Sequence, residues 1–129
     1  MRRSEERGQF ALEGSDLGVW DWNLLTNDVY FSPRWLEMLG YGPGEIRERF
    51  SEWYDRVHPE DREHAVKETQ RHIRGETPFY EARHRLRCKD GSYKWILSRG
   101  KVMSRNAEGK PLRIVGTHRD ITEQVQVEE

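Results

Sequence analysis

The sequence predicts a single α+β domain in which helices cover one face of an antiparallel sheet. Two patterns support this fold class. Apolar residues alternate with a period of two near both ends of the chain, and between residues 32 and 75 they recur at helical spacing. Strands that are segregated from helices along the sequence are typical of an antiparallel sheet with a helical layer. A chain of 129 residues has the usual length of one domain.

The composition indicates an aromatic core beneath a charged surface. Only 34% of the residues are hydrophobic, yet five Trp, five Tyr and four Phe supply a large buried area per residue. The 22 basic and 23 acidic side chains are interspersed, and the net charge is -1. A nucleic-acid partner is therefore not expected, because such proteins carry a basic excess or patch.

The lone cysteine, Cys88, excludes an intramolecular disulfide and fits a reducing compartment. No apolar run is long enough to span a bilayer, and the first residues lack the apolar core of a signal peptide. We therefore expect a cytoplasmic location and no membrane contact by this segment.

The N-terminal part predicts a short helix followed by a hairpin. Residues 1–14 form a charged helix that ends at Gly14, and its few apolar side chains require it to dock as a cap. Residues 17–25 alternate and place Trp20, Trp22 and Leu24 on one face of a strand. A turn at residues 26–28 leads to a second strand at residues 29–31.

The middle of the chain predicts helices. Ser32 and Pro33 are a helix N-cap and first position, and Gly40 ends that helix. Residues 45–57 have the spacing of two short helical turns. A longer helix begins at His58-Pro59 with acidic residues in its first turn, and ends at Gly75.

The last part predicts three strands. From Pro78 the alternation places one set of side chains inward: Tyr80, Ala82, His84, Leu86 and Cys88. Asp90-Gly91 is a hairpin turn, after which residues 93–103 form a long strand that is apolar on both faces and lies inside the sheet. A turn at residues 106–110 precedes the last strand, residues 113–122, and the polar tail begins a linker.

These segments together resemble the PAS domain, a sensor module of bacterial signalling proteins. The first half of the resemblance lies in Gly18-Val19-Trp20-Asp21-Trp22, Leu39-Gly40-Tyr41 and Val57-His58-Pro59-Glu60-Asp61. The C-terminal half, the PAC part, lies in Arg85-Leu86-Arg87, Lys89-Asp90-Gly91 and Asp120-Ile121-Thr122. The resemblance covers residues 15–123 in the expected order, with residues 1–14 as the capping helix and 124–129 as the start of a linker helix.

The resemblance implies a five-stranded antiparallel sheet that encloses a small cavity with its helices. It also implies a homodimer, an output domain in the same protein (of histidine kinase or diguanylate cyclase type) and a small-molecule ligand. The expected cavity residues come from the helices and the strand that follows them: Trp35, Met38, Leu39, Val66, Thr69, His72, Ile73, Tyr80, Ala82 and His84.

Two further pairs follow from the resemblance. Glu45 and Lys89 match a salt bridge that ties the helical side to the strand hairpin. Asp120 and Thr122 match an Asp-x-Thr pair that caps the linker helix and marks the exit of the signal, which is compatible with a plain cap.

Cofactor chemistry leaves one alternative open. His72 lies on the long helix, where haem-binding PAS domains carry a ligand, although a single histidine on an apolar stripe is more often a core residue. His84 either orients a ligand or bonds a neighbouring helix. Flavin is not expected, because Cys88 lies on a strand and the Asn-Cys-Arg-Phe-Leu segment of flavin photoreceptors is missing.

No catalytic or metal-binding motif occurs: the chain lacks a nucleophile elbow, a P-loop, a His-Glu-x-x-His motif and a cysteine pair. The sequence therefore predicts a regulatory domain that is not itself an enzyme. The alternative is a dimerisation scaffold without a ligand, since aromatic side chains can fill the space that a ligand would take.

Overall fold

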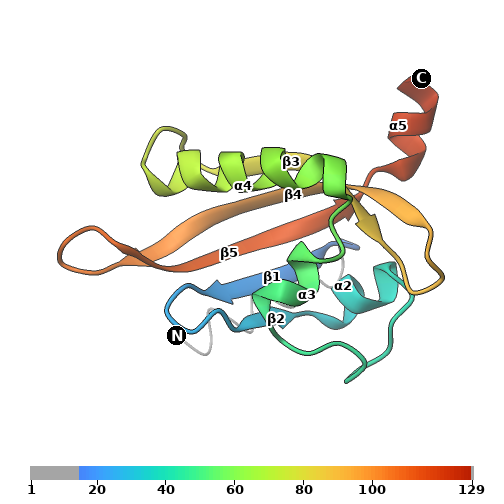
Figure 1. Ribbon diagram of the computed structural model, residues 1–129, viewed down its shortest axis with the longest axis horizontal. Coiled ribbons are helices and arrows are strands. Elements are labelled where there is room, and N and C mark those ends of the chain that lie inside the picture. The colour runs from blue at the N-terminus through green and yellow to red at the C-terminus, as the bar shows by residue number, and fades with distance from the viewer. Residues whose placement is uncertain (1–14, 129) are drawn as a thin grey trace.

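The computed structural model describes residues 15–128, and its centre is one five-stranded antiparallel sheet with strand order β2-β1-β5-β4-β3 (Figure 1). The strands are β1 (Gly18–Asn23), β2 (Val29–Phe31), β3 (Tyr80–Arg87), β4 (Tyr93–Arg105) and β5 (Pro111–Asp120). The helices are α2 (Pro33–Met38), α3 (Phe50–Tyr54), α4 (Pro59–Ile73) and α5 (Thr122–Glu128). The α+β fold and the five antiparallel strands predicted from the sequence are confirmed. The capping helix predicted for residues 1–14 lies outside the described residues.

The sheet brings the two ends of the sequence together. β1 pairs with β5 from Gly18↔His118 to Asn23↔Arg113, so the first strand lies beside the last. β4 is held on both sides, by β3 and by β5. Its position inside the sheet is as predicted, but its second half is exposed, and Met103 retains 60% of its accessible surface. The apolar pattern of this strand therefore does not mean burial on both faces.

Local signals in the sequence position the helices. The Ser32 hydroxyl accepts hydrogen bonds from Trp35 N at the start of α2 and from Val19 N in β1, at 3.3 and 2.8 Å. Gly40 follows the helix with a φ of +87°, a conformation that L-residues rarely adopt. At the start of α4, His58 Nδ1 accepts from Glu60 N at 3.1 Å, and Pro59 occupies the first helical position.

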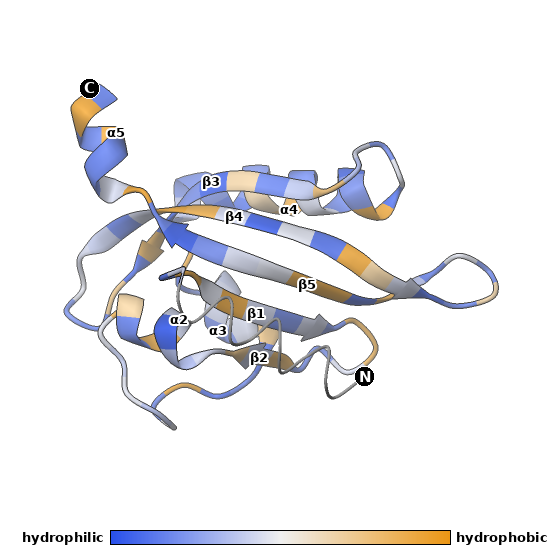
Figure 2. Cartoon of the chain, turned by 180° about the vertical axis from the view of Figure 1, so that it is seen from behind, coloured by the Kyte–Doolittle hydropathy of each residue, from blue (hydrophilic) through white to orange (hydrophobic). Residues whose placement is uncertain are grey.

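Three helices, α2, α3 and α4, lie on one face of the sheet, and in the view from behind the strands lie in front of them (Figure 2). The alternation predicted for β3 is confirmed, because Tyr80, Ala82, His84 and Leu86 are buried and the intervening residues are more exposed. The helix α5 continues from the end of β5 and projects away from the sheet (Figure 1).

Two predicted boundaries differ from the structure. In the segment 45–57 the only helix is α3, so the first predicted helical turn is wrong: the Glu45 carboxylate accepts from Gly42 N at 2.6 Å and stabilises a turn there. The last strand ends at Asp120, because the Asp120 side chain binds Thr122 N and begins α5 at that point.

Candidate functional site

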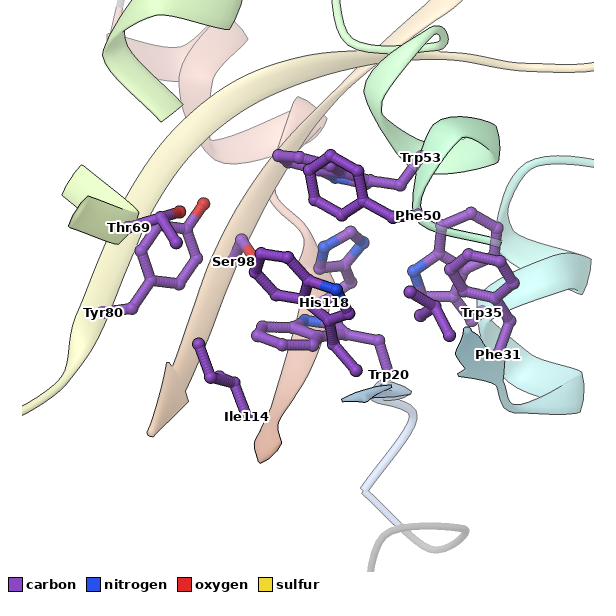
Figure 3. A pocket seen from close by; sticks show the side chains of 12 residues that line it. Trp20, Phe31, Trp35, Phe50, Trp53, Thr69, Tyr80, Ser98, Ile114 and His118 are labelled. Carbon is purple, nitrogen blue, oxygen red and sulfur yellow. The ribbon is translucent and has the colours of Figure 1, made fainter. Parts of the chain in front are cut away.

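A cavity of about 40 Å³ lies between the sheet and the helices α2, α3 and α4 (Figure 3). Most of its lining is aromatic or aliphatic, with a few hydroxyl and ring nitrogen atoms. The lining residues are Trp20, Trp22, Val29, Phe31, Trp35, Phe50, Trp53, Thr69, Tyr80, Ser98, Ile114 and His118. An apolar pocket with a few convergent polar groups is the usual form of a small-molecule site.

The floor of the cavity is the indole of Trp20, which lies flat on the sheet. Two glycines make this possible: a Cβ atom on Gly116 or Gly100 would overlap the Trp20 ring. Gly116 is directly opposite Trp20 in the pairing of β1 with β5. The Trp20 nitrogen donates to the carbonyl of Thr117 at 3.3 Å, which fixes the ring over β5.

Aromatic side chains from the sheet and from the helices form the walls. Phe31 and Trp35 stack with their ring centroids 4.0 Å apart, and Trp22 stacks on Phe50 at 4.6 Å. Phe50 and Trp53 belong to α3, whose short helix covers the cavity (Figure 3). The segment is tied to the sheet by Phe50 N, which donates to Asn27 O at 3.0 Å.

Two buried imidazoles lie beside these rings. The Trp53 nitrogen donates to His84 Nε2 at 3.2 Å, so the His84 proton resides on Nδ1, which has no partner in the described part of the chain. The centroids of His84 and His118 are 5.6 Å apart. Burial lowers the pKa of His84 to about 4 and that of His118 well below its usual value. Both rings are therefore neutral at pH 7.

The far end of the cavity carries hydroxyl groups. Tyr80 is buried, and its hydroxyl makes no hydrogen bond of good geometry within residues 15–128, although the Ser98 and Thr69 hydroxyls lie near it. Burial raises the pKa of Tyr80 to about 12, which outweighs the opposite effect of these hydroxyls. Thr69 donates its own proton to Ala65 O at 2.9 Å in α4.

The structure brings three of the ten expected cavity residues to the cavity: Trp35, Thr69 and Tyr80. The other seven lie nearby but outside its lining: Met38, Leu39, Val66, His72, Ile73, Ala82 and His84. Most of these pack in the core between α2, α4 and the sheet, and His84 contacts the cavity residue Trp53 through its hydrogen bond.

The side chain of His72 holds two backbone groups. Val102 N donates to His72 Nε2 at 3.0 Å, and the other ring nitrogen, Nδ1, donates to Thr77 O at 3.0 Å. An iron ligand at Nε2 would displace the Val102 bond, and the cavity of about 40 Å³ is far smaller than a haem or a flavin. The residues present do not fit either group. Cys88 is buried, and burial raises the pKa of its thiol.

The pair Glu45 and Lys89 joins the helical side to the hairpin of β3 and β4. Lys89 Nζ lies 2.6 Å from Glu45 Oε2, and Lys89 N donates to Leu39 O at 2.9 Å. The hydrogen bond from the Lys89 ammonium lowers the pKa of Glu45 most, and the bond from Gly42 N lowers it further. Both side chains are about half exposed, so the backbone bond is the firmer link.

Asp120 and Thr122 connect β4 and β5 to α5. Asp120 Oδ1 accepts from Thr122 N at 3.0 Å and from the Thr122 hydroxyl at 2.7 Å, while that hydroxyl accepts from Trp95 N at 3.0 Å. Partial burial raises the pKa of Asp120, but the Thr122 bonds and the Lys94 ammonium, 3.5 Å away, outweigh it and lower the pKa. The start of α5 is thus fixed to the strand that carries Ser98.

A second ion pair fixes α4 to the edge of the sheet. The Asp61 carboxylate receives both Arg85 Nε and Arg85 Nη2 at 2.9 Å, and Arg85 N at 2.8 Å. The Arg85 guanidinium also lies over the Trp95 ring, 5.1 Å from its centroid. Burial raises the pKa of Asp61, but the Arg85 bonds outweigh it and hold the pKa below its usual value.

Several lining residues were not predicted from the sequence, above all His118 and Ile114 of β5 and Ser98 of β4. The period-two pattern Ile114, Gly116, His118 was available as a signal, since it alternates with the more exposed Val115 and Thr117. It becomes meaningful only when β5 is known to lie beside β1. No group of three or more metal-ligating side chains occurs within residues 15–128, and no helix there is long and apolar enough to cross a membrane.

Comparison with known proteins identifies close relatives of this fold. A family model described as PAS fold matches residues 28–118. The chain is 32% identical over 124 residues to the probable diguanylate cyclase DgcE of Escherichia coli, and 34% identical over 116 residues to the hybrid signal transduction histidine kinase A of Dictyostelium discoideum. These matches cover 96% and 84% of this chain, but only 11% and 5% of the relatives.

Two solved structures are similar in both sequence and fold. A sensory box histidine kinase/response regulator from Burkholderia thailandensis matches with a TM-score of 0.82 and 33% identity, over 95% of this chain and 89% of that one. The N-terminal domain of a diguanylate cyclase with PAS/PAC sensor from Marinobacter aquaeolei matches with a TM-score of 0.72 and 28% identity, over 84% and 98% of the two chains.

Proposed function

Because the chain belongs to the PAS fold family, we propose that it is the sensory domain of a longer signalling protein and that a small molecule in the cavity sets its signal. The observation that carries this proposal is Trp35 Nε1, a buried polar atom of a cavity residue that has no hydrogen-bond partner within residues 15–128. A buried polar group without a partner costs about 1–3 kcal/mol, and a bound molecule would recover part of that cost.

The relay to the output runs through β4 and β5. Ser98 and His118 line the cavity from these two strands, and the same strands hold α5 through Trp95 and Asp120. A change in packing at the cavity therefore has a short route to Thr122. For this to act as a switch, the domain needs two arrangements that differ in ligand affinity.

The output domain is proposed to follow in the same protein. The sensory relatives are diguanylate cyclases and histidine kinases, and the chain spans a small part of the curated ones. We infer an output domain of one of these two types. We also infer that the protein is a homodimer, in which two output domains are controlled together. Analytical ultracentrifugation of the full-length protein tests the dimer, and a monomer at micromolar concentration contradicts it.

The direct test of ligand sensing is to denature the purified protein and identify the released small molecules by mass spectrometry. A cavity-filling variant, Thr69→Leu, should exclude the ligand and fix the output of the full-length protein in one state. The matched control is Gln70→Leu, since Gln70 is exposed on the same helix. Absence of a released molecule, together with unchanged output in Thr69→Leu, contradicts ligand sensing.

The small cavity supports a second function, a dimerisation scaffold without a ligand. About 40 Å³ is room for roughly three water molecules, and the aromatic side chains fill most of the space around it. In a scaffold, Thr69→Leu would fill an empty space and stabilise the protein without changing the output. The same pair of variants therefore separates the two functions.

A further inference from the structure

The hydrogen-bonding capacity of Trp35 restricts what the cavity can hold. Trp35 is 1% exposed and belongs to α2, and its Nε1 has no partner within the described residues. An indole N–H can only donate a hydrogen bond. The indoles of Trp20, Trp22 and Trp53 already donate to Thr117 O, Asn27 Oδ1 and His84 Nε2. Among these indoles, only that of Trp35 still requires a hydrogen-bond acceptor, and a ligand in the cavity could supply it.

The lining carries no formal charge. None of the lining residues is Lys, Arg, Asp or Glu, and burial keeps the two ionisable rings neutral, because it lowers the pKa of His118 and raises that of Tyr80. An ion transferred into such a site without a counter-charge loses several kcal/mol of solvation. Neither an anion nor a cation finds compensation there.

The two ends of the cavity carry different polar groups. In Figure 3 the indole nitrogen of Trp35 points toward the ring of His118, and the centroids of the two rings are 5.7 Å apart. Tyr80 and Ser98 lie on the opposite side of His118 (Figure 3). Their hydroxyls can donate or accept, so that side tolerates either kind of group. The aromatic floor and walls favour an apolar body between the two ends.

We propose that the cavity binds a small neutral molecule whose hydrogen-bond acceptor, such as the oxygen of an amide, a ketone or an alcohol, accepts from Trp35 Nε1. This inference rests on the proposed function, that the cavity senses a ligand. The volume of about 40 Å³ restricts the ligand to a few non-hydrogen atoms, since a water molecule requires roughly 10–15 Å³ of such space.

The test is a titration of the ¹⁵N-labelled chain with four planar probes that have the same number of non-hydrogen atoms: acetamide, acetate, acetamidinium and isobutene. Acetamide should shift the Trp35 indole N–H resonance saturably. Isobutene lacks the acceptor and forms no hydrogen bond, so it should bind without the downfield shift that acetamide gives this resonance. Acetate and acetamidinium should leave the resonance in place. The Trp22 indole, already bonded to Asn27, is the internal control.

Two variants check the residue assignment. Trp35→Phe keeps an aromatic ring but removes the donor, so it should weaken acetamide binding about fivefold and leave isobutene binding unchanged. Tyr80→Phe leaves the Trp35 donor in place and should retain the shift of its indole resonance by acetamide. Should Trp35→Phe fail to fold, the responses of the Trp35 resonance to the four probes on the unaltered protein still decide the proposal.

Several results would overturn the inference. Tighter binding of acetate or acetamidinium contradicts a neutral ligand, and an equal downfield shift of the Trp35 resonance by isobutene contradicts the role of Trp35. A Trp35 resonance that contacts only water and responds to none of the probes shows a hydrated cavity instead. A charged or larger molecule released from the same preparation by denaturation overturns this inference and leaves the proposed function intact.

Discussion

Replacing Gly116 by alanine tests whether Trp20 forms the floor of the cavity. The added Cβ would overlap the Trp20 ring and the carbonyl oxygen of Arg99. Neither can move cheaply, because the Trp20 ring is buried against the sheet and the Arg99 oxygen belongs to the backbone of the neighbouring strand. Overpacking of this kind costs about 1–3 kcal/mol, and two rigid obstacles place it near the upper end.

One effect opposes this cost. Alanine reduces the conformational entropy of the unfolded chain, which raises the free energy of unfolding by about 0.4–1 kcal/mol. The expected net loss of unfolding free energy is therefore about 2 kcal/mol. Gly42→Ala is the matched control, since its Cβ would meet only the flexible end of the Glu45 side chain, at 3.2 Å. This variant should stay within about 0.5 kcal/mol of the parent.

The assay is urea unfolding followed by circular dichroism, in which a lower midpoint at constant slope reports a loss of stability. In a Trp20→Phe background the smaller ring removes part of the overlap, so Gly116→Ala should cost about 1 kcal/mol less than in the parent. Equal midpoints for Gly116→Ala and Gly42→Ala would refute the close packing of Trp20 on Gly116.

Two further predictions concern charge. Since His84 and His118 have lowered pKa values in the folded state, the unfolded chain binds protons first on acidification, and stability falls below pH 6.5. At pH 5 the loss is about 2 kcal/mol for His84. His118 adds to the loss in the same direction, so His118→Gln should reduce the total loss in urea unfolding measured across pH. Asp61→Asn removes the charged partner of Arg85 and should cost about 2 kcal/mol at pH 7. Because the folded-state pKa of Asp61 is lowered, this cost should begin to fall below pH 3.8 and vanish once the pH drops through that lower folded-state pKa, and a cost that does not change with pH contradicts an electrostatic origin.

Much of the fold can be predicted from the sequence, because the patterns that determine its helices, strands and turns are local. The alternation from Tyr80 to Cys88, the N-cap at Ser32 and the turn at Gly91 each depend on neighbouring residues only. The helical turn predicted near Glu45 failed because a carboxylate bond to Gly42 stabilises a turn where spacing alone suggests a helix.

The lining of the cavity is harder to predict from the sequence, because it depends on the pairing of strands that are distant in the chain. Trp20 faces the cavity only since Gly116 and Gly100, about 80–100 residues later, leave room for its ring. His118 becomes a lining residue through the same pairing. The expected residues Trp35, Thr69 and Tyr80 were found because their own helices and strand already have an inward face.

We propose that the state of the cavity reaches α5 through the contact between Trp95 and Thr122. Amide hydrogen exchange at Trp95 N, which donates to Thr122, and at Val125 N, which donates to Ile121 O, measures it directly. Thr69→Leu alters the cavity from α4, so the substituted residue itself lies outside β4 and β5, and Gln70→Leu is its control. Thr69→Leu should change both exchange rates together, and Gln70→Leu should change neither. Unaltered exchange at both amides in Thr69→Leu would contradict this relay.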